Sequence, residues 1–186
     1  MTSRLERLAQ RYEQFCSLPW EHSLAGAQRI WFAVYDKNDE RRLRSRVGEF
    51  ELSTRRAGHG WREVDLTEAF GRWMGALEYR DAFFETPEDL ELLLPEFEEA
   101  IAKQITDELK HPDTDETTVV AVQGLACLFG FVKVSSLMNK VASAVRGRLL
   151  VFFPGEHEDN NYRLLDARDG WNYMAIPITA HDGAEV

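Results

Sequence analysis

The densest group of side chains that could do chemistry is the run Glu156-His157-Glu158-Asp159. It follows the apolar run from Leu149 to Phe153, which predicts a strand buried on both faces, as in a parallel sheet. Because ligand sites in open α/β sheets lie beyond the carboxyl ends of the strands, these carboxylates are candidates for acid-base chemistry or for holding Mg²⁺. A solvated loop is the interpretation that we favour, since charged runs after a strand are usually only exposed.

Motifs for common catalytic centres are missing from the sequence. A phosphate-binding P-loop needs a lysine followed by serine or threonine, and none of the five lysines has that neighbour. Gly58-His59-Gly60 precedes a predicted strand, so it indicates a helix end and not a dinucleotide-binding turn. The five histidines lack H-x-H and H-x-x-x-H spacing, so we expect no metal site and no cofactor. Cys16 and Cys127 are predicted to be buried free thiols.

The acidic charge is concentrated in one part of the chain. The net charge is −10, and residues 85–116 hold twelve acidic residues and two lysines, which accounts for the whole excess. Binding to DNA depends mainly on neutralising phosphates, so we expect no direct nucleic-acid binding. The basic run from Arg41 to Arg46 is interleaved with acids on an amphipathic helix, which favours a solvated face over a phosphate contact.

Five segments are predicted to be β-strands, near residues 30–35, 61–65, 119–122, 149–153 and 173–178. Helical patterns separate these segments, so the sequence predicts a three-layer α/β fold with a mostly parallel five-stranded sheet flanked by helices. Pro177 indicates that the last strand lies at an edge. Residues 1–186 are expected to form a single domain, with no membrane span and no signal-peptide core, and therefore to reside in the cytoplasm.

Helix starts can be recognised from capping patterns. Ser3 and Glu6 form an S-x-x-E capping box that predicts an amphipathic first helix. We expect Asn38 or Asp39 to cap a second helix. Thr86-Pro87 and Pro95 indicate two further helix starts, which predicts an acidic helical insertion between the second and third strands.

The carboxyl edge of the predicted sheet is the candidate partner-binding surface. Pro154 and Gly155 are expected to turn the chain sharply there, with Gly155 in positive φ or in close backbone contact. Glu156, Asn161 and Tyr162 lie in the loop that follows, and Gly124 follows the neighbouring strand; we expect these loops to meet on one rim. An alternative is that Pro154, Gly155 and Asn161 only close the loop onto the protein itself.

Two segments, VVAVQGLACLFGFVKVSSLMNKV and RGRLLVFFPGEHEDNNYRLLDARDGWNYMAIPI, resemble the BrxB family of the BREX bacteriophage-defence systems. The matching positions are Phe131, Val132, Ser135, Leu137, Asn139, Phe153, Pro154, Gly155, Glu156 and Asn161. Lys37, Gly130 and His157 depart from the residues usual at their positions.

The resemblance implies a small, non-catalytic component that binds the phosphatase-like PglZ protein and works with the other BREX components, a methyltransferase and an AAA+ ATPase. It brings no catalytic residues with it. A second hypothesis is a degenerate or metal-dependent enzyme that processes nucleotides or nucleic acid through Glu156, Glu158 and Asp159. Whether the protein forms a homo-oligomer is left open by the sequence.

Overall fold

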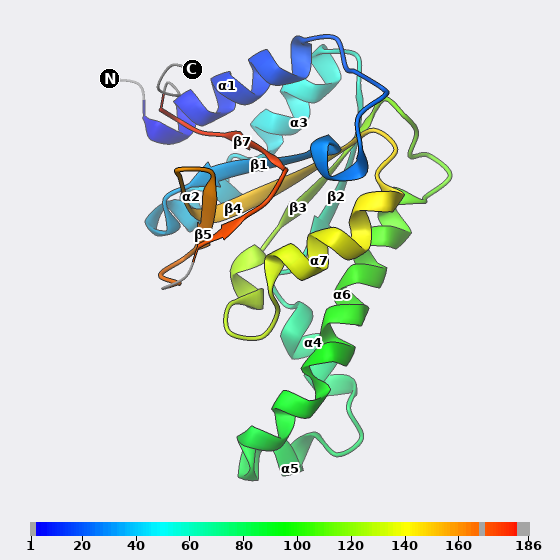
Figure 1. Ribbon diagram of the computed structural model, residues 1–186, viewed down its shortest axis with the longest axis vertical. Coiled ribbons are helices and arrows are strands. Elements are labelled where there is room, and N and C mark those ends of the chain that lie inside the picture. Colours follow the sequence, from blue (N-terminus) through cyan, green and yellow to red (C-terminus); the bar gives the residue numbers. More distant parts are fainter. Residues whose placement is uncertain (1–2, 168–169, 182–186) are drawn as a thin grey trace.

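In the computed structural model, which describes residues 3–167 and 170–181, a parallel sheet lies between two layers of helices (Figure 1). The strands are β1 (Ile30–Tyr35), β2 (Gly60–Asp65), β3 (Thr118–Gln123), β4 (Arg148–Glu158), β5 (Asn161–Leu164), β6 (Trp171–Asn172) and β7 (Ile176–Ile178). The α-helices are α1 (Arg4–Ser17), α2 (Glu40–Arg44), α3 (Val47–Arg56), α4 (Ala69–Ala76), α5 (Arg80–Glu85), α6 (Leu94–Leu109) and α7 (Val134–Val141). Short 3₁₀ helices are η1 (Gly26–Arg29), η2 (Lys37–Asp39), η3 (Pro87–Leu93), η4 (Leu125–Leu128) and η5 (Ala142–Ala144).

The main sheet has the strand order β2-β3-β4-β1-β7, and each neighbouring pair in this order is parallel. The predicted α/β class, with a mostly parallel sheet flanked by helices, is therefore confirmed. Among the residues that the structure describes, β7 pairs only with β1, so Pro177 lies in an edge strand as expected. A proline is tolerated there because an edge strand has one side on which no N–H is needed.

Each face of the sheet has its own core because the central strands are buried on both sides. On one face α1, α2 and α3 supply Leu8, Tyr12, Cys16, Leu43, Val47 and Phe50. On the other face α6 and α7 supply Phe97, Ile101, Ile105, Leu109, Leu137, Met138 and Val141. This burial explains why β1 and β3 are almost continuous apolar runs, whereas the edge strand β2 includes Arg62 and Glu63.

The helix starts agree with the sequence in one case and differ in another. At α1 the capping box is present: Ser3 Oγ accepts from the Glu6 N–H at 3.2 Å, and the Ser3 N–H donates to Glu6 Oε2 at 2.7 Å. Asp39 is the N-cap residue of α2, which is one of the two predicted positions, but its side chain makes no capping hydrogen bond. Asp36 Oδ1 accepts from the Asn38 N–H at 2.9 Å and starts η2, because an aspartate at the end of a strand can form this local turn.

The connection from β2 to β3 is long and helical, with α4, α5, η3 and α6 in sequence. Phe97, Ile101, Ile105 and Leu109 of α6 are buried, as the spacing predicted. Pro95 lies in the first turn of α6. Residues 77–94, which are termed the arm below, lie at the end of this connection that projects from the sheet (Figure 1).

Two further findings concern the sequence predictions for cysteines and membrane spans. Neither cysteine forms a disulfide; Cys16 is buried, whereas Cys127 is only partly so. Burial raises the pKa of the Cys127 thiol to about 11. In the described part of the chain, no helix combines the length and the apolar character needed to cross a membrane.

Candidate functional site

A crevice of about 390 Å³ lies at the carboxyl ends of β1 and β4. The chain leaves these two adjacent strands toward opposite faces of the sheet. After β1 it enters α2 and α3, which pack on one face, and after β4 it enters β5, whose Tyr162 and Leu164 pack on the other. This divergence is the arrangement at which open α/β sheets usually bind their ligands.

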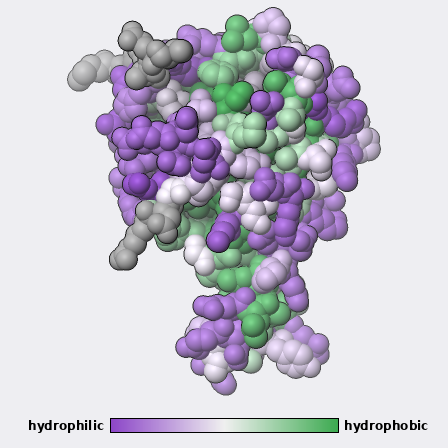
Figure 2. Space-filling model, viewed as in Figure 1, coloured by the Kyte–Doolittle hydropathy of each residue, from purple (hydrophilic) through white to green (hydrophobic). Residues whose placement is uncertain are grey.

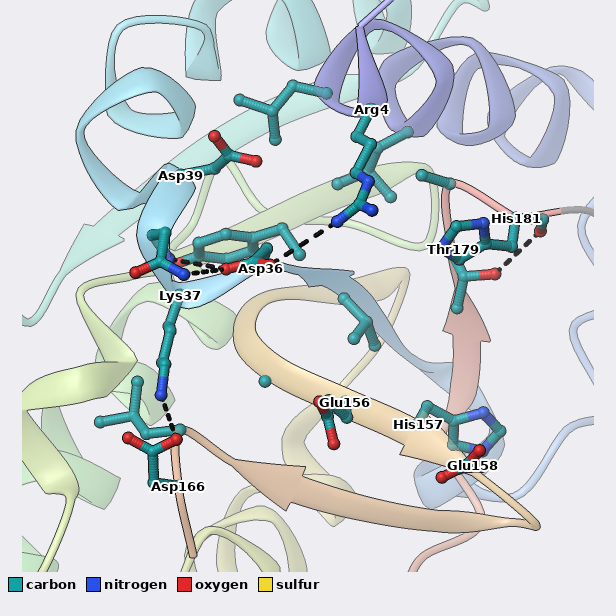
Figure 3. A pocket seen from close by; sticks show the side chains of 18 residues that line it. Arg4, Asp36, Lys37, Asp39, Glu156, His157, Glu158, Asp166, Thr179 and His181 are labelled. Carbon is teal, nitrogen blue, oxygen red and sulfur yellow. Dashed lines mark hydrogen bonds and ion pairs between the residues drawn. The ribbon is translucent and has the colours of Figure 1, made fainter.

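The hairpin beside this crevice corrects a prediction. Pro154 and Gly155 lie where β4 curves sharply (Figure 3), but they do not end the strand: β4 continues through them to Glu158 and pairs with β5 in antiparallel fashion. The partner of β4 changes at this point, because Pro154 is its last residue opposite β1 and Gly155 its first opposite β5. A proline is accommodated where one ladder ends and another begins.

Gly155 is required by a close backbone approach and not by positive φ. A Cβ atom at this position would lie 2.0 Å from the carbonyl oxygen of Arg163 on β5. Of the two reasons predicted for this glycine, close backbone contact is therefore the one observed.

The two-residue turn of the hairpin lies five residues after the predicted turn at Pro154 and Gly155. Asp159 and Asn160 both have positive φ, at 49° and 62°, and they connect the paired residues Glu158 and Asn161. Two such residues define the tight turn that matches the twist of a β-hairpin, and Asp and Asn adopt it more readily than most residues. This turn signal was present in the sequence and could have revealed β5.

The predicted partner-binding residues fall into an exposed and an interior group. Glu156 and Asn161 are exposed on the hairpin. Pro154 is buried, and so is Tyr162, whose hydroxyl donates to the Ala175 carbonyl at 2.7 Å. Burial raises the pKa of Tyr162. Pro154 and Tyr162 thus support the surface from inside and do not form it.

Gly124 lies on the same edge of the sheet but outside the β1/β4 crevice. It has a φ of 79°, and a Cβ atom there would lie 2.4 Å from the Thr67 nitrogen, so it holds the loops after β2 and β3 together. A second, shallower crevice of about 670 Å³ adjoins this region and is lined mainly by apolar side chains, including the stacked pair Phe70 and Phe131. Leu165 lines both crevices, so the predicted rim is divided into two hollows.

Charged side chains from separate segments line the β1/β4 crevice, and several pair with one another (Figure 3). Arg4 Nη1 lies 3.7 Å from Asp36 Oδ2, and Lys37 forms an ion pair with Asp166. Sequence reasoning did not single out Arg4, Lys37 or Asp166 as site residues. The only signal was that Asp36 and Lys37 follow directly after a buried strand.

The carboxylates of the run from Glu156 to Asp159 line one small hollow but are not arranged as a metal site. Strand alternation places Glu156 and Glu158 on one side of the hairpin and His157 on the other, where its ring lies 4.5 Å from that of Tyr162. Burial lowers the pKa of His157. Within residues 3–167 and 170–181, no three His, Cys, Asp or Glu side chains are grouped so that they could hold a metal ion.

The fold and the crevice define an α/β domain with a polar hollow at the carboxyl edge of its sheet. Comparisons of the chain with protein-family models, with curated proteins and with solved structures found no match. The family resemblance stated from the sequence therefore stays a prediction.

Proposed function

We propose that this protein is a non-catalytic, BrxB-like component of a BREX-type phage-defence system and acts by binding other proteins, with the PglZ-like protein as its first partner. The observation that carries the proposal is the β4–β5 hairpin. It is fixed by the close approach at Gly155, and it presents Glu156 and Asn161 to solvent at the carboxyl edge of the sheet.

A fixed hairpin suits recognition of a protein surface. Glu156 is held beside Arg163, with Oε2 and Nη1 at 3.6 Å, while the two side chains remain 67% and 47% exposed. A surface that is ordered before binding loses less conformational entropy when a partner docks. The resemblance adds to this argument, because Phe153, Pro154, Gly155, Glu156 and Asn161 of its motif all lie in this hairpin or at its base.

The test is a binding assay between the purified protein and the PglZ-like protein of the same system. Replacing Glu156 and Asn161 by alanine is expected to weaken binding at least about tenfold, since both side chains lie at the proposed contact. Glu13 and Gln14, which are exposed on α1, supply the matched double-alanine control. If the wild-type protein binds none of the BREX components, the proposed function is refuted. If the Glu156 and Asn161 variant binds normally, the claim that the hairpin is the contact surface is refuted.

A second candidate is an enzyme or binding protein for nucleotides, and the position of the β1/β4 crevice favours it. Glu156 and Glu158, two of the three carboxylates of this hypothesis, line that crevice, whereas Asp159 does not. Titration calorimetry with Mg²⁺, Mn²⁺ and nucleotides tests it: heat of binding that disappears in the Glu156→Gln variant supports the candidate, and the absence of any heat refutes it.

A further inference from the structure

The arm, residues 77–94, is rich in apolar side chains that the chain itself does not bury. It holds eight large apolar residues, and Tyr79, Phe84 and Leu92 are 71%, 73% and 80% exposed. The other five are only partly buried: Leu77, Phe83, Leu90, Leu93 and Leu94. Figure 2 shows apolar and polar surface side by side at the narrow lower end of the molecule, where Figure 1 places α5 and the start of α6.

The arm has little structure that could be stable without other contacts. α5 is six residues long and η3 is a seven-residue 3₁₀ helix. Helices this short are marginal by themselves. Thr86 Oγ1 bonds to Asp89 Oδ2 at 2.9 Å, and Arg80 Nη1 donates to the Gly75 carbonyl at 2.8 Å. These bonds shape the arm but leave Tyr79, Phe84 and Leu92 facing solvent, and exposed apolar side chains gathered in one region are typical of a contact surface.

The charge of the arm restricts what can cover these side chains. Residues 77–94 include six acidic residues and one arginine, a net charge of −5. Two arms from two copies of the chain would bring equal charges together, which opposes self-association through this surface. Nucleic acid and anionic lipid would be repelled for the same reason. A complementary surface must be apolar at its centre and basic at its border.

We infer that the arm docks into an apolar groove bordered by lysine and arginine side chains on a partner protein. Phe84 and Leu92 are the central anchors, because they are among the most exposed large apolar side chains of the described residues. Glu88 and Glu91, on η3 beside Leu92, face the basic border. The inference rests on the proposed function only for the choice of the first probe, and the arm is a surface separate from the β4–β5 hairpin.

The first test measures binding to the purified PglZ-like protein at several salt concentrations. Exchanging Phe84 and Leu92 for serine is expected to weaken binding at least about tenfold. The change Leu52→Ser, at a 49% exposed residue of α3, is the apolar control. Charge reversal at Glu88 and Glu91 should weaken binding and make it less dependent on salt. Salt weakens binding by screening ion pairs between the arm and the partner, and the variant lacks these ion pairs. Glu116→Lys provides the charge control, since Glu116 is exposed and acidic but lies outside the arm.

The outcomes separate this inference from the proposed function. Loss of binding in the arm variants with normal binding in both controls supports the inference. Wild-type binding that the arm variants retain overturns it and leaves the proposed function standing. Should the wild-type protein bind no BREX component, the proposed function fails, and the arm is tested with a labelled amphipathic peptide of leucine and lysine. Peptide binding that requires Phe84 and Leu92 supports the inference. Absent peptide binding, or binding that the arm variants retain, overturns it. The inference is also overturned if the wild-type protein forms a dimer that the arm variants do not form, because the arm would then bind a second copy of the chain.

Discussion

Gly155→Ala is expected to destabilise the protein strongly although it adds a single methyl group. The new Cβ atom would lie 2.0 Å from the Arg163 carbonyl oxygen and 2.9 Å from Phe153 Cε1. An ordinary van der Waals contact needs about 3.4 Å or more, so β5 would have to move by more than 1 Å. That movement strains the pairing of β4 with β5, where Gly155 lies opposite Leu164. It also strains the hydrogen bond that the Leu165 N–H donates to the Pro154 carbonyl at 2.9 Å.

The expected loss is about 2–4 kcal/mol in the free energy of unfolding, from overpacking and weakened hydrogen bonds. For a domain of this size it corresponds to a fall of about 5–15 °C in Tm. Circular dichroism during heating and during urea denaturation measures both quantities. Gly48→Ala is the control: nothing lies within 4 Å of a Cβ there, and alanine suits helix α3, so stability should stay equal or rise by up to about 1 kcal/mol. A Gly155→Ala protein as stable as the Gly48→Ala protein would refute the close-approach argument.

Three further changes test the hairpin and the loop after β3. Tyr162→Phe should cost about 1–2 kcal/mol in urea denaturation, because the Ala175 carbonyl loses its donor; an unchanged midpoint would contradict that bond. Gly124→Ala should cost about 2 kcal/mol or more, since alanine disfavours a φ of 79° and its Cβ would meet the Thr67 nitrogen; a Tm equal to wild type would disprove this. Burial lowers the pKa of His157 below its ordinary 6.5, so its contribution to stability is complete above pH 6.5 and is lost as the pH falls toward the lowered pKa. His157→Phe should remove that part of the pH dependence, and identical stability profiles of the two proteins would argue against it.

Much of the fold could be predicted because burial on both faces leaves a clear pattern in the sequence. β1 and residues 149–153 of β4 are uninterrupted runs of aliphatic and aromatic residues, and the starts of both strands were predicted almost to the residue. β5 and β6 were missed because they are short and partly exposed. The sequence did contain a signal for β5: two turn-forming residues are followed by Tyr162 and Leu164, two apolar residues that alternate with polar ones.

The candidate site was harder to predict than the fold. Pro154 suggests a strand end by its own chemistry, but tertiary pairing overrides that preference where β4 exchanges one partner for another. Arg4, Lys37 and Asp166 line the same crevice only because α1, the loop after β1 and the segment after β5 converge. Such convergence depends on strand order and register, which a single sequence does not specify.

The position of β1 inside the sheet has a consequence for how the polypeptide folds as it is synthesised. Ile30 of β1 pairs with Leu149, 119 residues later, and Trp31 pairs with Ile176, 145 residues later. At the usual rate of translation, the ribosome needs about 6–24 s to synthesise the residues between Ile30 and Leu149. Both edges of an apolar strand stay without their final neighbours during that time, and contacts so distant in sequence form slowly. Nascent chains of this protein should therefore depend on chaperones until β4 and β7 have emerged, and a chain that stops before Ile176 would leave β1 as an open, aggregation-prone edge.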